Sequence, residues 1–212
     1  MKEVYVLSGL GVDHRVFEHF RFENMRVTFL AWVLPVKHES LAAYAKRMAQ
    51  QITTAHPILI GLSFGGMVAI EIAKILAVQK IICIASAKEK AEIPLLFRLL
   101  GRLKVHTLLP TACLKRSNSL TYWFFGVHTQ EDKKLLKAIL DDTDPVFLRW
   151  AIDAILTWNN TTIPSNVLHI HGDRDRLLPH RLVTVDYSIV GGGHFMTVNK
   201  ASQIEAIISA HL

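Results

Sequence analysis

Residues 61–66 read Gly-Leu-Ser-Phe-Gly-Gly, and they lie between a short apolar run and a segment with helical periodicity. A serine hydroxyl is a weak nucleophile, so it must be presented clear of the backbone and next to a base. A sharp strand-to-helix turn presents it in this way, and the crowded turn requires small residues two positions before and after the serine. Gly61 and Gly65 meet this requirement. The pattern predicts Ser63 as a nucleophile, although glycines and a serine also form ordinary tight turns.

Candidates for an acid and a base occur later in the chain. Asp173 and Asp175 follow Gly172, shortly after the apolar run at 166–170, and each is a candidate acid; the alternative for either is a surface ion pair with a neighbouring arginine. His194 follows a run of glycines and precedes the last helical segment. Serine, aspartate and histidine therefore each come directly after a predicted strand, in one of the chain orders known for serine hydrolases.

A serine nucleophile also needs two backbone N–H groups to stabilise the oxyanion that forms on the attacked carbonyl. The N–H of Phe64, directly after the serine, is the first candidate. The glycine-rich loop at residues 8–11 follows the first apolar run, and it offers Leu10 as the second donor. The loop lacks the third glycine of a dinucleotide-binding Gly-x-Gly-x-x-Gly motif, so the sequence favours an oxyanion hole there.

Six short apolar runs alternate with helical segments, which predicts strands of a parallel sheet that are buried on both faces. The runs are 4–7, 26–31, 57–60, 80–84, 166–170 and 186–190. Helices are predicted over 41–53, 64–77 and 202–211, with another that starts at Asp144-Pro145. The expected fold is α/β, a three-layer αβα sandwich around a mainly parallel six-stranded sheet.

Residues 87–144 interrupt this alternation, because they have helical periods and no clear strand. We expect an α/β core domain formed by residues 1–86 and 145–212, and a helical insertion formed by 87–144. The insertion contains a group of aromatic residues that are candidates for lining a substrate pocket, although such residues more commonly belong to a core. They are Phe97, Tyr122, Trp123, Phe124 and Phe125. Seven basic and two acidic residues lie between 87 and 120, so this segment is either a solvated helix surface or a basic lid that attracts acidic substrates.

The composition narrows the class of protein. The chain has 212 residues and a formal net charge of +6, which suits one sizeable core. No apolar run approaches the 18 or so residues of a membrane span, and no nucleic-acid motif accompanies the positive charge. The first apolar run is too short for a signal peptide. Cys83 and Cys113 lie in apolar surroundings, so we expect buried free thiols in a cytoplasmic protein, with a single disulfide as the alternative.

The chain resembles the α/β-hydrolase superfamily over nearly its whole length. Residues 61–66, 172–179 and 192–195 are similar to the nucleophile, acid and base segments of that superfamily. Its acid segment commonly reads Gly-x-x-Asp-x-x-x-Pro, and this resemblance selects Asp175 over Asp173.

The resemblance extends to the oxyanion loop and to the insertion. Ser8-Gly9 stands where the superfamily has a histidine–glycine pair, which leaves Leu10 as the matching donor. The first two strands of the superfamily's sheet have no counterpart, so the resemblance implies a reduced sheet of six strands. The insertion falls where members of the superfamily carry a lid.

The activity that the resemblance implies is that of a small, esterase-like serine hydrolase with a short helical lid. Such an enzyme cleaves a carboxylic ester, thioester or related acyl bond of a small molecule through an acyl-enzyme on Ser63, with Asp175 as acid and His194 as base. It uses no metal and no organic cofactor. Whether the protein is a monomer or a homodimer is not fixed by the sequence.

Two other classes of function remain open. One is a ligand receptor that uses the same fold without catalysis. The other is a metal-dependent hydrolase, because residues 169–173 read His-Ile-His-Gly-Asp and resemble the His-x-His-x-Asp-His pattern of metallo-β-lactamase-like proteins. Its ligands would be His169, His171 and Asp173, and Arg174 replaces the closing histidine of the pattern.

Overall fold

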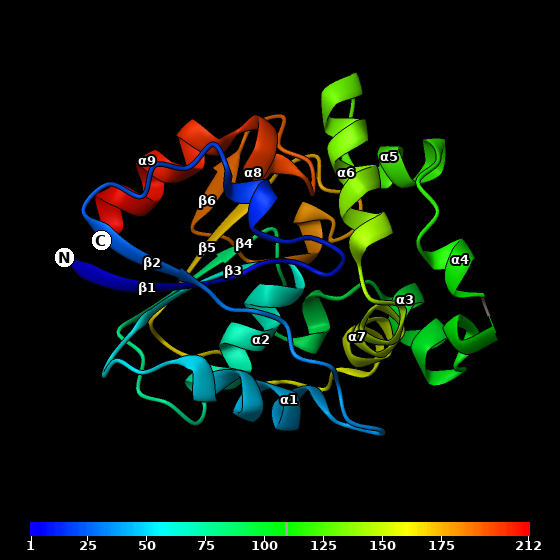
Figure 1. Cartoon of the computed structure of the whole chain (residues 1–212), viewed down its shortest axis with the longest axis horizontal. Coiled ribbons are helices and arrows are strands. Elements are labelled where there is room, and N and C mark those ends of the chain that lie inside the picture. The colour runs from blue at the N-terminus through cyan, green and yellow to red at the C-terminus, as the bar shows by residue number, and fades with distance from the viewer. Residues whose placement is uncertain (109) are drawn as a thin grey trace.

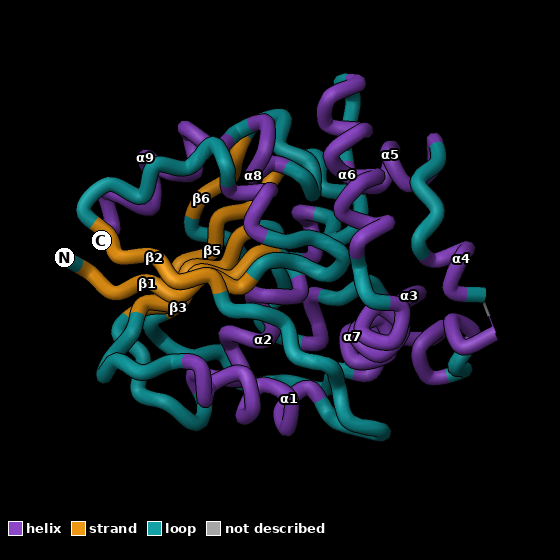
Figure 2. Tube along the Cα trace, in the orientation of Figure 1, coloured by secondary structure: helices purple, strands orange, loops and turns teal. Residues whose placement is uncertain are grey.

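A computed structural model describes residues 1–108 and 110–212, so Leu109, which falls within the predicted insertion, lies outside the described residues. Six strands form one sheet (Figure 2). Their order is β2-β1-β3-β4-β5-β6, and every neighbouring pair is parallel. The strands are β1 (Lys2–Leu7), β2 (Met25–Phe29), β3 (Ile58–Leu62), β4 (Lys80–Ile84), β5 (Val167–Gly172) and β6 (Tyr187–Ile189). The predicted three-layer fold with a parallel six-stranded sheet is confirmed.

Helices cover both faces of this sheet and the end opposite the chain termini (Figure 1). One face carries α1 (Leu41–Met48) and α2 (Phe64–Ala73), and the other carries α8 (Met196–Asn199) and α9 (Ala201–His211). The remaining helices lie beyond the ends of the strands: α3 (Leu95–Arg102), α4 (Thr111–Leu114), α5 (Ser119–Phe125), α6 (Gln130–Asp142) and α7 (Pro145–Thr157).

Alternate side chains of the central strands pack into two separate cores. On β1, Val4 and Val6 belong to the core beneath α9, whereas Tyr5 and Leu7 belong to the core beneath α1 and α2. A central strand therefore needs apolar residues at every position, which is why the central strands stand out as uninterrupted apolar runs. The prediction of burial on both faces was wrong for β2 and β6, which are largely exposed because each is an edge strand with one neighbour.

The segment 87–144 contains α3 to α6 and, in its described part, no strand. The helix that follows it, α7, packs against α3. Gly101 of α3 lies so close to Leu156 of α7 that an added Cβ atom would stand 2.6 Å from the Leu156 Cβ atom. α7 therefore packs both against the insertion and into the core beneath α1 and α2, to which its Phe147 and Ala151 belong.

The two cysteines are both free, but one of them lies on the surface. Cys83 is buried in β4, whereas Cys113 in α4 is exposed rather than buried as expected. Burial raises the pKa of the Cys83 thiol to about 12, so this thiol is protonated and unreactive at neutral pH.

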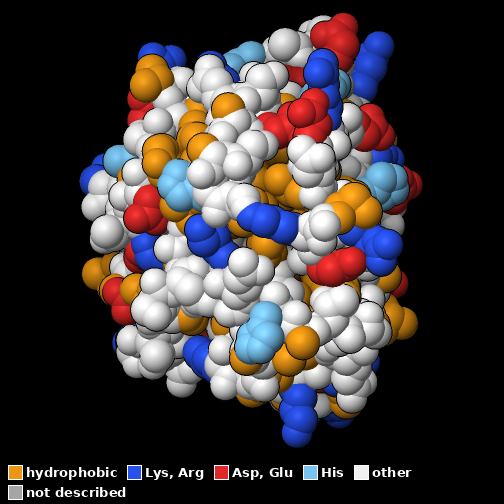
Figure 3. Space-filling model, turned by 90° about the vertical axis from the view of Figure 1, so that its left-hand side faces the viewer, with side chains coloured by type: hydrophobic (Ala, Val, Ile, Leu, Met, Phe, Trp, Pro, Cys, Tyr) orange, Lys and Arg blue, Asp and Glu red, His pale blue; other side chains and the backbone are white. Residues whose placement is uncertain are grey.

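The surface near the termini has mixed charge. Lys and Arg side chains are interspersed there with acidic, histidine and apolar side chains (Figure 3). Among the described helices, none is both long enough and apolar enough to cross a lipid bilayer.

Candidate active site

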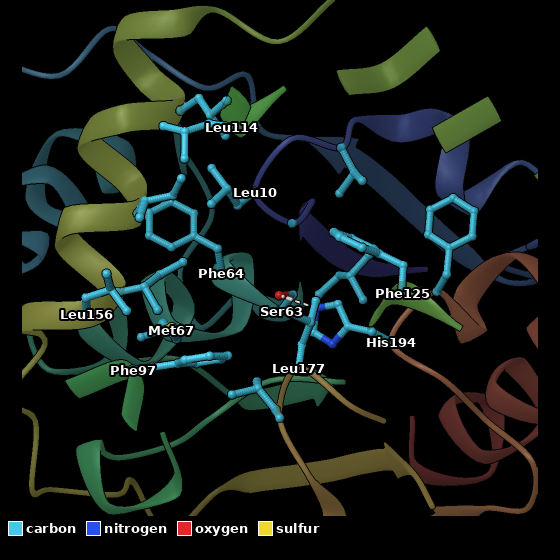
Figure 4. Close-up of a pocket in the computed structure, with 18 of the residues that line it drawn as sticks. Leu10, Ser63, Phe64, Met67, Phe97, Leu114, Phe125, Leu156, Leu177 and His194 are labelled. Carbon is cyan, nitrogen blue, oxygen red and sulfur yellow. Dashed lines mark hydrogen bonds between the residues drawn. The ribbon is translucent and has the colours of Figure 1, made fainter. Parts of the chain in front are cut away.

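Three side chains from loops that follow β3, β5 and β6 meet at the carboxyl edge of the sheet. Ser63 Oγ lies 2.8 Å from His194 Nε2 (Figure 4), and His194 Nδ1 lies 2.7 Å from Asp175 Oδ2. The carboxyl ends of neighbouring parallel strands lie along one edge of the sheet, so residues far apart in the chain meet there. The result is a continuous row of hydroxyl, imidazole and carboxylate, which is the arrangement that activates a serine.

The backbone at Ser63 is strained. Its φ and ψ angles are 50° and −118°, in a region that residues with a side chain rarely adopt. A Cβ atom on Gly61 would stand 2.5 Å from the Gly66 backbone nitrogen, and one on Gly65 would overlap carbonyl oxygens at the end of β1. The turn is held by a hydrogen bond of 2.6 Å from Ser86 Oγ to the Ser63 carbonyl. Both glycines are therefore required by the close packing of the turn that exposes the hydroxyl.

Two backbone N–H groups are available beside the nucleophile. Phe64 is the first residue of α2, so its N–H has no acceptor within the helix. Leu10 lies in the turn closed by the hydrogen bond from Val12 N to Gly9 O, and like Phe64 it lines the cavity that contains Ser63. Within the described residues neither N–H has an acceptor. Both residues therefore bring an N–H group without an acceptor to the cavity that contains Ser63.

Asp175, and not Asp173, lies beside His194. The Asp175 side chain is buried, and its Oδ1 accepts the N–H groups of Leu177 and Leu178, each at 2.9 Å. Burial raises the pKa of this carboxyl, but the charge of His194 and the hydrogen bond from it outweigh burial and hold the pKa below its usual value. Asp173 is exposed, and its Oδ1 accepts the Gly191 N–H at 2.7 Å.

A cavity of about 320 Å³ opens beside Ser63, and its lining is almost entirely apolar. Phe97 and Phe125 line it, as expected from the sequence. Tyr122, Trp123 and Phe124 do not belong to its described lining, and Trp123 is instead exposed, with the Arg176 guanidinium 4.6 Å from its ring centre. Helix α7 contributes a group that sequence reasoning did not single out: Leu148, Ile152, Ile155 and Leu156. Leu156 and Phe97 lie on the side away from His194 (Figure 4).

The basic residues of the insertion do not reach this cavity, whose described lining contains no Lys, Arg, Asp or Glu. Lys88 is buried against Glu92 at 3.2 Å. Lys104 pairs with Asp153 at 3.3 Å, and Lys115 donates to two backbone carbonyls. The hypothesis of a basic lid that selects an acidic acyl group therefore has no support in the cavity itself.

His169 and His171 occupy alternate positions of β5 and are both fully buried. Their ring nitrogens are used in hydrogen bonds, with His171 Nδ1 lying 3.2 Å from His169 Nε2. The described residues contain no group of three or more His, Cys, Asp or Glu side chains that could hold a metal ion, so the sequence His-x-His-x-Asp does not fold into a metal site with Asp173. Burial, together with the neighbouring His171 and Lys88, lowers the pKa of His169 to about 3.

The low pKa of His169 predicts a stability that depends on pH. In the unfolded chain His169 binds a proton below about pH 6.5, whereas the folded protein keeps it neutral down to about pH 3. The unfolded state thus binds more protons between these values, so acidification lowers the free energy of unfolding by up to about 1.4 kcal/mol per pH unit through this residue. The free energy of unfolding, measured by urea denaturation, should fall between pH 7 and pH 5 by about 2 kcal/mol more in the wild type than in His169→Gln. Equal losses in both proteins would contradict a neutral, buried His169.

Comparison with known proteins shows a likeness of fold. No protein-family model and no curated protein sequence matches the chain. Among solved structures, an esterase from Thermogutta terrifontis is 16% identical with a TM-score of 0.70, over 99% of this chain and 89% of that one. A hydrolase from Oleispira antarctica is 14% identical with a TM-score of 0.73, over 100% and 90% of the two chains, and MenH from S. aureus is 16% identical with a TM-score of 0.71, over 99% and 92%. The sheet order, the strained turn after β3 and these likenesses together show that the chain has the α/β-hydrolase fold.

Proposed function

We propose that this protein is a serine hydrolase that cleaves an ester, thioester or related acyl bond of a small molecule. The observation that carries the proposal is the hydrogen-bonded row of Ser63, His194 and Asp175, at 2.8 Å and 2.7 Å, beside two N–H groups without acceptors. A turn that only reverses the chain does not require a strained serine that is hydrogen-bonded to an imidazole, nor a buried carboxylate on the other side of that imidazole.

The reaction that these groups support has two steps. In the first, His194 Nε2 takes the proton of the Ser63 hydroxyl while the oxygen attacks the acyl carbonyl, and His194 then gives that proton to the leaving group. Asp175 Oδ2 accepts the Nδ1–H of His194 and stabilises the imidazolium. In the second step His194 takes a proton from water, which attacks the acyl carbonyl of the acyl-enzyme; the bond to Ser63 Oγ breaks, His194 gives the proton to Oγ, and the acid is released. The N–H groups of Leu10 and Phe64 stabilise the oxyanion in both steps.

An uncharged, apolar acyl group fits the cavity best. Apolar side chains line its walls, and its volume of about 320 Å³ lies at the lower end of the range for small-molecule sites. Each methylene that enters such a cavity contributes about 0.8 kcal/mol, which corresponds to roughly a fourfold gain in kcat/KM until the cavity is full. A charged acyl group would lose its hydration without gaining a partner.

A fluorophosphonate probe tests this proposal, because such probes phosphonylate activated serines. We expect one adduct, mapped by mass spectrometry to Ser63, and no adduct in His194→Ala. p-Nitrophenyl esters of increasing chain length should then show kcat/KM rising to an optimum and falling beyond it. An adduct on another serine, or the absence of both labelling and hydrolysis, would overturn the proposal; tight binding of an acyl ligand without turnover would instead indicate a receptor.

The far wall of the cavity should set the chain-length optimum. Replacing Leu156 with tryptophan fills space on the side away from His194, so we expect kcat/KM for the best long-chain ester to fall about tenfold or more. Hydrolysis of p-nitrophenyl acetate should change less than about threefold, because the short acyl group does not reach this wall. Leu103→Trp is the matched control, since Leu103 is 73% exposed and outside the cavity lining. A uniform loss for all esters in Leu156→Trp would show that the cavity does not hold the acyl chain.

A further inference from the structure

A chain of buried polar groups runs from Asp175 into the interior of the protein. His171 Nε2 lies 2.8 Å from the Leu178 carbonyl and 3.5 Å from Asp175 Oδ2. His171 Nδ1 lies 3.2 Å from His169 Nε2, and His169 Nδ1 lies 3.1 Å from the ammonium of Lys88. Lys88 in turn pairs with the buried Glu92. The mechanism above uses none of these groups except the aspartate.

The two ends of this chain fix which nitrogens carry protons. A carbonyl oxygen accepts hydrogen bonds and does not donate them, so His171 must carry its proton on Nε2, facing the Leu178 carbonyl. Burial lowers the pKa values of both His171 and His169, so both rings are neutral and each carries one N–H. His171 Nδ1 is then an acceptor, and His169 must donate to it from Nε2. This leaves His169 Nδ1 as an acceptor, and it accepts from Lys88, which can donate but not accept. The Thr184 carbonyl also lies 3.0 Å from His169 Nδ1, and it accepts a hydrogen bond from Lys88 Nζ instead of from the ring.

Each ring N–H of the chain is therefore on the side of the ring that is nearer Asp175: His169 donates to His171, and His171 donates to the Leu178 carbonyl, with its Nε2 atom 3.5 Å from Asp175 Oδ2. We propose that His171, His169 and Lys88 are positioning residues, which orient these dipoles so that the Asp175 carboxylate is held in place for His194. This inference rests on the proposed function, because it takes Asp175 as the acid of the triad.

His171 acts on Asp175 by two routes. Its Nε2 atom lies 3.5 Å from Asp175 Oδ2, the same oxygen that accepts the Nδ1–H of His194, so the dipole of this N–H is close to the carboxylate. It also donates to the carbonyl of Leu178, whose own N–H donates to Asp175 Oδ1 at 2.9 Å. The first route stabilises the negative charge directly, and the second fixes the loop that orients the carboxylate.

The sign of the effect on pH dependence follows from this geometry. The His171 N–H partly compensates the charge of Asp175, so its removal leaves a carboxylate that attracts the His194 imidazolium more strongly. Protonation of the catalytic base in the free enzyme is then favoured, and the acid limb of the kcat/KM profile moves to higher pH. The other titratable groups that face this chain from neighbouring elements are His180, beside the His171 ring, and Asp186, Cys83 and Glu92, beside His169 and Lys88.

Two substitutions of His171 test the proposal. His171→Leu removes the donor, and we expect kcat to fall about tenfold and the acid limb to move up by about half a pH unit or more. His171→Gln places an N–H close to the position of Nε2, so both quantities should return most of the way to wild-type values. Rates are expressed per active site, titrated with the fluorophosphonate probe, so that a poorly folded fraction does not count. An unchanged acid limb in His171→Leu, or no recovery in His171→Gln, would overturn the proposal.

The tautomers are measured without any reference to activity. Imidazole ¹⁵N shifts at neutral pH should show His169 and His171 both protonated on Nε2 alone. Replacing the buried ion pair together, in Lys88→Met with Glu92→Gln, leaves no unpaired charge, and His169 can then donate from Nδ1 to the Thr184 carbonyl 3.0 Å away. We expect a mixture of tautomers in this variant, and the wild-type pattern in Glu92→Gln alone. Nδ1 protonation of either histidine in the wild type would overturn the proposal.

Failure of this inference and failure of the proposed function give different results. Without ester hydrolysis or labelling at Ser63 in the wild type, the proposed function fails, whatever the tautomers are. With normal hydrolysis and labelling in the wild type, an unshifted acid limb in His171→Leu rejects the positioning role alone.

Discussion

Replacing Ser63 with alanine is expected to reduce kcat for the preferred ester by roughly 10⁵- to 10⁶-fold. The substitution removes the oxygen that attacks the acyl carbonyl in the proposed reaction, and it leaves the cavity, His194 and the two N–H donors in place. Alanine meets the same backbone strain as serine at a φ of 50°, so the turn and the fold should be retained. Ester hydrolysis and circular dichroism melting, measured on the same preparation, check both expectations.

The matched control for this variant is Ser119→Ala, because Ser119 is an exposed serine in α5. It should hydrolyse esters and react with the fluorophosphonate probe as the wild type does. Residual activity of Ser63→Ala within about a hundredfold of the wild type would mean that another group attacks the ester, and the acyl-enzyme on Ser63 would have to be abandoned.

Asp175→Asn should lower kcat by about 10⁴-fold while leaving the fold intact. The N–H groups of Leu177 and Leu178 both donate to Asp175 Oδ1, so the amide oxygen of asparagine will take that position. The amide NH₂ then faces His194 Nδ1, which lies 2.7 Å from the present Oδ2 atom. His194 must accept there and carry its proton on Nε2, so it can no longer take the proton of Ser63.

Asp173→Asn is the control for this prediction, and the two positions are close in sequence. Asp173 is exposed and accepts the N–H of Gly191, and an asparagine oxygen can accept it equally well. We expect kcat/KM within about twofold of the wild type, as for an ordinary surface substitution. A large loss in Asp173→Asn with little loss in Asp175→Asn would reverse the assignment of the acid.

Structural features that depend on residues close together in the chain could be predicted from the sequence. The central strands were predicted because both of their faces are buried, which demands an unbroken apolar run. The order of strands in the sheet is set by contacts between distant segments, so the apolar runs did not reveal that β2 and β6 are edge strands. For the same reason the order of Ser63, Asp175 and His194 after predicted strands was informative, since the carboxyl ends of parallel strands converge.

The cavity was harder to predict, because a helix that lines a cavity and a helix that packs against a core have the same apolar pattern. Phe97 lines the cavity, whereas Trp123 lies on the surface, and no local feature of the chain distinguishes them. The sequence did contain an indication that the two buried histidines lie side by side. His169 lies in the predicted strand 166–170 and His171 directly after it, so their side chains share a face if the strand continues, but their partner Lys88 comes from a different part of the chain.

The difference in exposure between the two cysteines allows a thiol-reactive dye to be attached at a single site. Cys83 is buried and its thiol pKa is raised to about 12, whereas Cys113 is exposed in α4. A maleimide dye at neutral pH will therefore modify one position in the native, unmutated chain. Leu114, the next residue, lines the cavity, so a fluorophore attached to Cys113 lies close to the cavity. Its emission is expected to change when a ligand binds in the cavity and when the ligand leaves.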